Sequence, residues 1–239
     1  MNEEVNTKTT NGLTRTGKPR KRTSGPVRDR ERTMLKLIDA VGEIIKTQGY
    51  TALGVNNIAK TADVNKKLIY RYFDNNVNNL IEAYVKRKDY WISLSGDMEQ
   101  IIAESKIDHG RPMVKTILKT HLSHFYAEDE MQKIVIWETS ERNKLMKEVG
   151  LKREAFGEEL FKLLTPYFEQ RTGVDFRGIM ALQVAGIIFM VLQSQASGNP
   201  FCGIDINDPA EMERMMKALD QITDLVYDKA AEGMGKKEV

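Results

Sequence analysis

The chain has 239 residues, of which 41% are hydrophobic and 29% charged, enough for an apolar core beneath a hydrated surface. A single cysteine excludes an internal disulfide framework and an all-cysteine metal cage. The first residues lack the apolar segment of a secretory signal. The most apolar run, 179–192, is shorter than the roughly 20 residues of a membrane span. We therefore expect a cytoplasmic protein without membrane contact, in which this run is a buried helix.

Charge is distributed unevenly along the chain. Residues 1–76 hold 15 Lys and Arg against 8 Asp and Glu, whereas the remaining residues hold 21 against 26. A basic head on an acidic body indicates that the head binds a polyanion, although a solvated charged tail gives the same balance.

Residues 1–27 are polar and rich in Thr, Gly, Lys and Arg, and we expect them to form a disordered arm. Arg20, Lys21 and Arg22 belong to its basic part. Two roles remain open for these three residues: contact with DNA, in the minor groove or at phosphates, and an inert tail.

Residues 28–76 are expected to form a helix-turn-helix unit. Apolar residues recur at spacings of three and four from Arg28 to Gln48, which predicts an amphipathic helix. A second short helix follows Gly54, and a third is predicted from Lys66 to Phe73 with Asn65 as its N-cap. Three short helices with a tight turn between the last two are typical of this motif, whose final helix enters the major groove of DNA.

The predicted DNA contacts are polar or small residues on the outer side of the second and third helices. Cations and hydroxyls there suit phosphates, and amides suit base edges. The candidates are Gly54, Asn56, Asn65, Lys66, Lys67, Tyr70 and Arg71. The alternative for Lys66 and Lys67 is that they are ordinary surface lysines.

The head resembles that of the TetR-type repressors over roughly residues 30–85. The resemblance is carried by Gly49-Tyr50, Val55-Asn56-Asn57-Ile58-Ala59, Ala62-Asp63-Val64-Asn65, Ile69-Tyr70-Arg71-Tyr72-Phe73 and Leu80. It implies three head helices, a connecting helix, and a helical body that binds a small-molecule effector and forms a homodimer. Members usually repress transcription from a near-palindromic operator and are released by that effector.

The chain departs from the family pattern at three places. Gly54 stands where a Thr or Ser usually caps the second helix, and Asp63 replaces the usual turn glycine. Asp tolerates the left-handed conformation better than most residues. One additional residue separates Phe73 from Leu80, and the usual lysine before the fourth helix is absent, so its phosphate contact is not carried over.

Residues 77–239 are expected to form an all-α body for effector binding and dimerisation. A connecting helix is predicted at 77–95, and further helices near 97–107, 112–127, 129–148, 151–170, 176–197 and 209–232. Pro166 lies within a helical pattern, so we expect that helix to kink or end there.

The last two helices are the predicted dimer interface, because the first of them is apolar almost all round and must be covered on several sides. Two helices from each chain would then form a four-helix interface. The candidates are Ala185, Ile188, Phe189, Leu192, Met215, Leu219, Ile222 and Val226. The alternative is that both helices fill the core of one chain.

Aromatic residues of the body are candidates for an effector pocket, since pockets are mostly apolar with a few polar groups. We select His121, Phe125, Trp137 and Tyr167, for which the alternative is an ordinary core position. His121 and His124 stand three apart, a spacing too common to predict a metal site. No catalytic or phosphate-binding motif is present, so we expect no metal, no cofactor and no enzymatic activity.

These patterns together predict a DNA-binding transcriptional regulator. A repressor that an effector releases is the preferred interpretation, and the sequence leaves an activator or a ligand-independent regulator open. The alternative from another class is a helical ligand-binding or interaction protein whose head has lost DNA binding.

Overall fold

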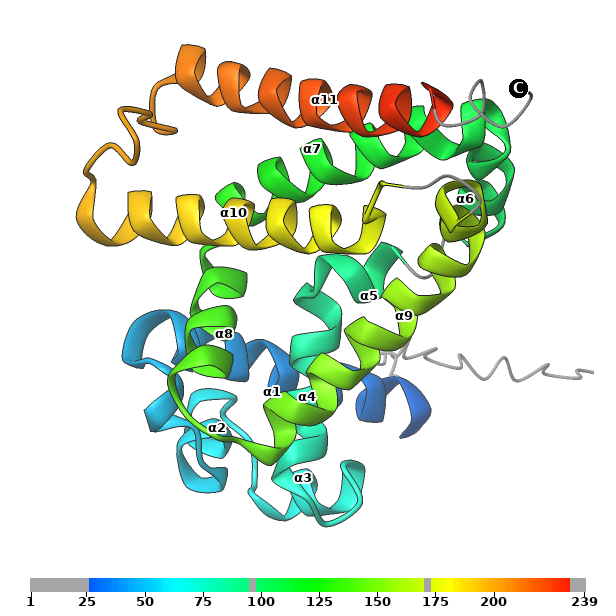
Figure 1. Ribbon diagram of the computed structural model, residues 1–239. Helices are drawn as coiled ribbons and strands as arrows, with labels where there is room; N and C mark the ends of the chain where they lie inside the picture. The colour runs from blue at the N-terminus through cyan, green and yellow to red at the C-terminus, as the bar shows by residue number, and fades with distance from the viewer. Residues whose placement is uncertain (1–25, 95–97, 170–172, 233–239) are drawn as a thin grey trace, which may run out of the picture.

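The computed structural model describes residues 26–94, 98–169 and 173–232, and in these ranges the chain is built from helices (Figure 1). The described residues contain no β-strand, and Phe201 and Ile204 form an isolated bridge. The predicted all-α fold class is therefore confirmed. Arg20, Lys21 and Arg22 of the predicted arm lie outside the described residues.

The helices fall into two groups joined by a middle section. In chain order they are α1 (Pro26–Gln48), α2 (Val55–Thr61), α3 (Lys67–Tyr72), α4 (Val77–Lys88), α5 (Tyr90–Leu94), α6 (Met98–Ser105), α7 (Arg111–Ala127), α8 (Asp129–Ser140), α9 (Lys144–Glu169), α10 (Phe176–Ser197) and α11 (Pro209–Glu232). The helices α7, α10 and α11 pack together at one end, α1 to α4 gather at the other, and α8 and α9 run between them (Figure 1).

The head is held together by one apolar side chain from each of α1, α2, α3 and α4. Ile44, Ile58, Ile69 and Leu80 are all fully buried. Burying such a side chain contributes roughly 1.5–3 kcal/mol. Because each of these helices turns its apolar side to this common core, its polar side faces outward.

The turn between α2 and α3 has the predicted geometry. Asp63 adopts the left-handed conformation with φ 52°, which Asp tolerates better than most residues. The N–H of Val64 donates to the carbonyl of Ala59 at 3.0 Å. The side chain of Asn65 accepts from the N–H of Lys67 at 2.9 Å, as expected of a helix cap. These local bonds hold α3 at a fixed angle to α2.

The predicted break at 149–150 is wrong. The helix α8 ends at Ser140, and α9 runs without interruption through Gly150. The side chain of Asn143 begins α9 by accepting from the N–H groups of Leu145 and Met146 at 2.8 and 3.3 Å. Gly150 is there for space rather than for a turn, since a Cβ at this position would lie 3.2 Å from Oε1 of Glu138 on α8.

One further boundary differs from the prediction. The connecting helix is not continuous over 77–95, because Asp89 is extended (φ −74°, ψ 117°) and separates α4 from α5. The carboxylate of Asp89 accepts from the N–H of Ile92 at 3.1 Å and so starts the new helix. Pro166 lies inside α9, which ends within one turn of it at Glu169, close to the expected bound at 170. One proline removes a single N–H donor.

Candidate nucleic-acid interface and internal cavity

The polar residues predicted to face DNA lie together on the outside of the head. Those on or next to α3 are all exposed, whereas Ile69 on the opposite side of the helix is buried. They are Asn65, Lys66, Lys67, Tyr70 and Arg71. Figure 1 places α3 at the end of the molecule opposite to α11, so no other described part of this chain covers this side.

Residues of α2 join the same surface. The ammonium of Lys66 donates to Oδ1 of Asn56 at 3.3 Å, which brings α2 and α3 side chains together. Gly54 is the N-cap residue of α2 and is extended and half-buried. The surface thus combines lysine and arginine cations, which attract phosphates, with amides that match base edges.

The start of α4, where the resembled heads carry a lysine, is built from asparagines. Asp74 and Asn75 are both left-handed, with φ 52° and 58°, and the N–H of Asn75 donates to the carbonyl of Tyr70 at 2.8 Å. The side chain of Asn76 caps α4 by accepting from the N–H of Asn78 at 2.9 Å. The additional residue is therefore accommodated in a left-handed turn, and the start of α4 offers amides and backbone N–H groups in place of a cation.

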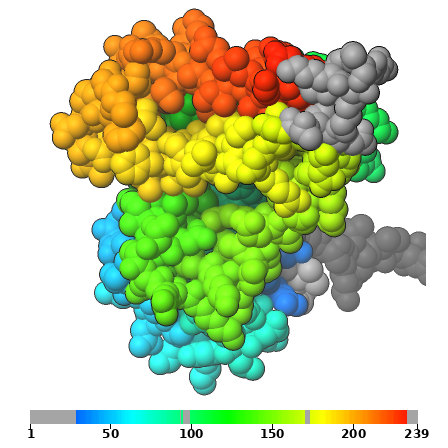
Figure 2. All heavy atoms as spheres, in the orientation of Figure 1, coloured from blue at the N-terminus to red at the C-terminus, as the bar shows by residue number. Residues whose placement is uncertain are grey.

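The body encloses a cavity of about 490 Å³ between α5, α7, α8, α9 and α10, within the size range of small-molecule sites. The outer surface is hollowed between α10 and the α8–α9 section (Figure 2). Most of the wall is apolar or aromatic. Representative residues, at least one from each helix, are Trp91, Phe125, Val135, Phe161, Met180 and Ile188.

Of the four residues predicted to line a pocket, two lie in this wall and two do not. His121 and Phe125 belong to it. Trp137 instead stacks on Tyr50 of the head, with ring centroids 5.3 Å apart, because its side of α8 faces the head. Tyr167 stacks on His109 at 4.0 Å, away from the cavity. The predictions for Trp137 and Tyr167 are therefore wrong.

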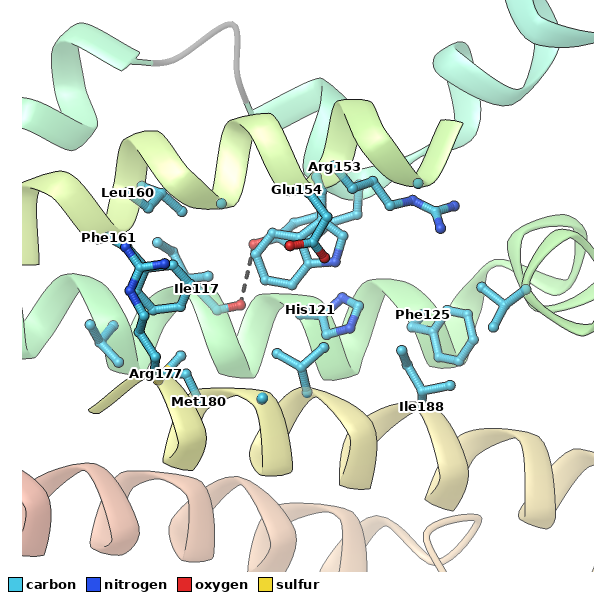
Figure 3. Close-up of a pocket in the computed structure, with 18 of the residues that line it drawn as sticks. Ile117, His121, Phe125, Arg153, Glu154, Leu160, Phe161, Arg177, Met180 and Ile188 are labelled. Atoms are coloured by element: carbon cyan, nitrogen blue, oxygen red, sulfur yellow. Dashed lines mark hydrogen bonds between the residues drawn. The ribbon is translucent and has the colours of Figure 1, made fainter. Parts of the chain in front are cut away.

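Three wall residues have buried polar atoms without a hydrogen-bond partner among the described residues: His121 at both ring nitrogens, His124 at Nδ1 and Arg153 at Nη2. His121 is 4% exposed. Its ring points from α7 into the space between α9 and α10 (Figure 3). Burial, with smaller contributions from the neighbouring His124 and Arg153, lowers the pKa of His121 to about 4. The imidazole is therefore neutral at physiological pH.

This neutral His121 makes the folded state sensitive to acid. Between pH 6.5 and about 4 the unfolded chain takes up a proton at this site and the folded chain does not, so stability falls as pH falls. Lowering the pH from 7 to 4.5 reduces the unfolding free energy of both proteins. We expect this reduction to be about 2–3 kcal/mol smaller in His121→Leu than in the wild type. Urea unfolding at each pH measures this difference. The exposed His109, replaced by Asn, is the control, and equal pH dependence in His121→Leu and the wild type would contradict the assignment.

Three charged residues, from α8, α9 and the junction of α4 and α5, form a partly buried cluster beside the cavity. Arg153 on α9 donates to the carboxylates of Asp89, between α4 and α5, and of Glu138 on α8. Asp89 is 0% exposed. These partners raise the pKa of Arg153 against the opposing effect of burial. The cluster connects the end of α4, which belongs to the head, to α8 and α9 of the cavity wall.

The sequence analysis did not identify this cluster. The signal that could have identified it is the position of Asp89 directly before the apolar Tyr90-Trp91-Ile92 run. A carboxylate within an apolar segment is expected to find a cation or a helix N-terminus, and Asp89 finds both.

The predicted dimer residues divide into exposed and buried positions. On α10, Ala185 and Phe189 are exposed and Leu192 is partly buried, whereas Ile188 turns inward to the cavity. On α11, Ile222 is exposed and Met215 is partly buried. Leu219 and Val226 are buried in the core of the same chain, so for these two the sequence-based assignment is wrong. The large exposed apolar residues also include Leu182 (75% exposed) and Leu225 (69%).

The helix α10 is less buried than the sequence suggested. By length and composition alone it could cross a membrane, yet a helix from the core of a soluble protein passes the same test. Only 28% of the 18-residue apolar stretch of α10 is buried inside this chain. The prediction of a helix covered on several sides is thus not met within one copy of the chain.

A basic helix-turn-helix head with an exposed α3, on an all-α body, is the arrangement of a class of DNA-binding proteins. Residues 37–83 match the family model of bacterial regulatory proteins, tetR family. The head therefore carries a DNA-binding domain similar to that of the tetR family, whereas the body is compared by its fold alone. No curated protein matches the chain in a sequence comparison.

Solved structures of similar fold include further regulators. FadR from Bacillus subtilis, in complex with stearoyl-CoA, is 18% identical with a TM-score of 0.56, over 82% of this chain and 98% of that one. A putative fatty acid metabolism regulator from Clostridium perfringens is 18% identical with a TM-score of 0.56, over 81% of this chain and 97% of that one. NalD, the secondary repressor of the MexAB-OprM multidrug efflux pump in Pseudomonas aeruginosa, is 18% identical with a TM-score of 0.55. The match covers 80% of this chain and 96% of that one. At these identities the likeness concerns the fold.

Proposed function

We propose that this chain is a homodimeric repressor that holds a near-palindromic operator with its two α3 helices and releases it when a small molecule enters the body cavity. Residues 28–76 would bind DNA, and residues 77–239 would bind the effector and dimerise. The observation that carries the proposal is the placement of all five polar α3 candidates on one exposed surface. The likeness in fold to FadR with bound stearoyl-CoA and to the repressor NalD supports it.

The second copy is proposed to pack on α10 and α11. Leu182, Phe189, Ile222 and Leu225 are each at least 40% exposed. They lie on two helices that both pack on α7, and a large exposed apolar patch marks an interaction site. Pairing α10 and α11 with their copies would form a four-helix interface. We infer that a second copy, rather than lipid, covers the apolar face of α10, which places the protein in the cytoplasm beside its DNA.

The conformational change that releases the operator would pass from the cavity to the head through α8 and α4. The helix α8 contributes Val135 and Glu138 to the cavity wall, and between them it carries Trp137, which stacks on Tyr50 of the head. The helix α4 ends at Asp89, whose carboxylate is held by Arg153 of the cavity wall. A ligand that prefers a different spacing of α8 and α9 would therefore shift both connections and change the separation of the two heads.

The DNA-binding part is tested with a duplex that carries the promoter of the chain's own gene. We expect specific binding that weakens steeply with salt, by about 10³-fold or more between 50 and 200 mM if six or more phosphates are contacted. Lys67→Ala is expected to weaken binding and to lower the slope of log affinity against log salt by about one. Fluorescence anisotropy at five salt concentrations measures both effects.

Lys229→Ala is the matched control, because Lys229 is an exposed lysine near the end of α11, at the other end of the molecule. It is expected to leave the salt slope unchanged. Salt-independent binding, or equal effects of the two substitutions, would refute the assignment of α3 as the DNA-contacting helix. Footprinting should show two half-sites about one helical turn apart or slightly more, and a single unpaired half-site would contradict the homodimer.

A further inference from the structure

The charges around the cavity indicate what kind of head group it accepts. Both arginines of the wall are already paired with carboxylates. Arg153 holds Asp89 and Glu138, and Arg177 donates to both oxygens of Glu158 at 2.8 and 2.9 Å. Glu154 adds another carboxylate to the wall near His121 (Figure 3). An anionic ligand would therefore meet an excess of negative charge, since Asp89, Glu138, Glu154 and Glu158 stand against Arg153 and Arg177.

Of the unbonded buried polar atoms of the wall, two belong to the neutral ring of His121. The others are Nδ1 of His124 and Nη2 of Arg153, whose guanidinium already holds two carboxylates. The imidazole of His121 is 4% exposed and leaves both ring nitrogens without a partner among the described residues. A neutral imidazole has one donor and one acceptor nitrogen, and burying them unbonded is costly. A ligand hydroxyl suits this site, because it can donate to the acceptor nitrogen or accept from the donor nitrogen of the ring.

Aromatic rings surround the same histidine. Trp91 and Phe125 lie with ring centroids 4.8 and 5.9 Å from that of His121, and Phe161 lies farther along the wall. Rings placed around a space prefer offset-stacked or edge-to-face contact with another ring. The wall thus suits a flat apolar body that carries its polar group next to His121.

We propose that the effector is an uncharged aromatic alcohol or phenol whose hydroxyl forms a hydrogen bond with His121 and whose ring system lies among Trp91, Phe125 and Phe161. This inference rests on the function proposed above, because it names the class of molecule that enters the effector cavity. It assigns His121 as the residue that distinguishes a hydroxyl from a bare ring or a charged group.

Four probes with one ring system test the class: naphthalene, 2-naphthol, 2-naphthoate and 2-naphthylmethylammonium. Titration calorimetry with the full chain at pH 7 is expected to rank 2-naphthol first, at least about tenfold tighter than either charged probe, which is the discrimination that one hydrogen bond or one misplaced charge gives. His121→Leu should reduce the affinity for 2-naphthol about fivefold to tenfold and leave that for naphthalene unchanged. His121→Gln, which keeps a donor and an acceptor, should retain the preference for 2-naphthol over naphthalene.

Each other outcome overturns the proposal. Tightest binding of 2-naphthoate would mean that a wall arginine receives an anion, and tightest binding of the ammonium probe would assign Glu138 and Glu154 to a cation. An unchanged 2-naphthol preference in His121→Leu would remove His121 from recognition, and no binding of any probe would exclude the class. Operator binding by the same preparation is measured in parallel, so a failure here leaves the DNA-binding proposal to its own test.

Discussion

Arg153→Met is expected to be among the most destabilising single substitutions in this chain, with a loss of about 3–5 kcal/mol in unfolding free energy. The methionine fills a similar space but leaves two carboxylates without their cation. One of them, Asp89, is 0% exposed and has no access to water that could replace the guanidinium. For a chain of this size the loss corresponds to a melting temperature lower by roughly 10 °C. Urea unfolding and thermal unfolding at pH 7 measure it.

Arg177→Met is the matched control. Arg177 also lines the cavity and also pairs with a carboxylate, but both Arg177 and Glu158 are about half exposed, and surface pairs contribute little. We expect no measurable change there. A combined variant, Arg153→Met with Asp89→Asn and Glu138→Gln, should recover much of the lost stability because no buried charge remains unpaired. If Arg153→Met behaves like Arg177→Met, the cluster does not stabilise the fold.

Local pattern was sufficient to predict the head. The i, i+3, i+4 spacing around Ile44 and Ile58, the left-handed tolerance of Asp63 and the capping side chain of Asn65 each act within a few residues, so the sequence interpretation found the three helices and the turn. Exposure of the α3 residues follows from the same periodicity. What these residues contact lies outside the chain, and a local pattern does not identify it.

The body was harder to predict because its decisive contacts join distant segments. Gly150 resembles a helix stop in the sequence but makes room for Glu138 of another helix. Trp137 and Tyr167 are as aromatic as Trp91, yet their rings stack on Tyr50 and His109 outside the cavity, while Trp91 lies in its wall. Which side of an aromatic-rich helix faces a cavity depends on how the helices are arranged, and no short window of sequence contains that information.

Replacing both exposed leucines of the proposed dimer surface is expected to have the largest effect on DNA binding. Leu182 on α10 and Leu225 on α11 are 75% and 69% exposed, so Leu182→Glu with Leu225→Glu should leave the fold of one chain unchanged. In the dimer the same change would bury carboxylates in an apolar interface without partners, a cost that favours separated chains. Sedimentation velocity is expected to show a monomer for this variant and a dimer for the wild type.

The double variant, which no longer dimerises, should bind the operator about 10²–10⁴-fold more weakly than the wild type. The reason is that its second head no longer binds as part of a linked pair. Leu151→Glu is the control, since Leu151 is 59% exposed on α9 and lies outside the proposed interface; it should leave both sedimentation and affinity unchanged. The far-ultraviolet circular dichroism and melting temperature of the double variant show whether each chain keeps its fold. A folded double variant that still sediments as a dimer would place the interface elsewhere, and a monomeric variant with full operator affinity would separate DNA binding from dimerisation altogether.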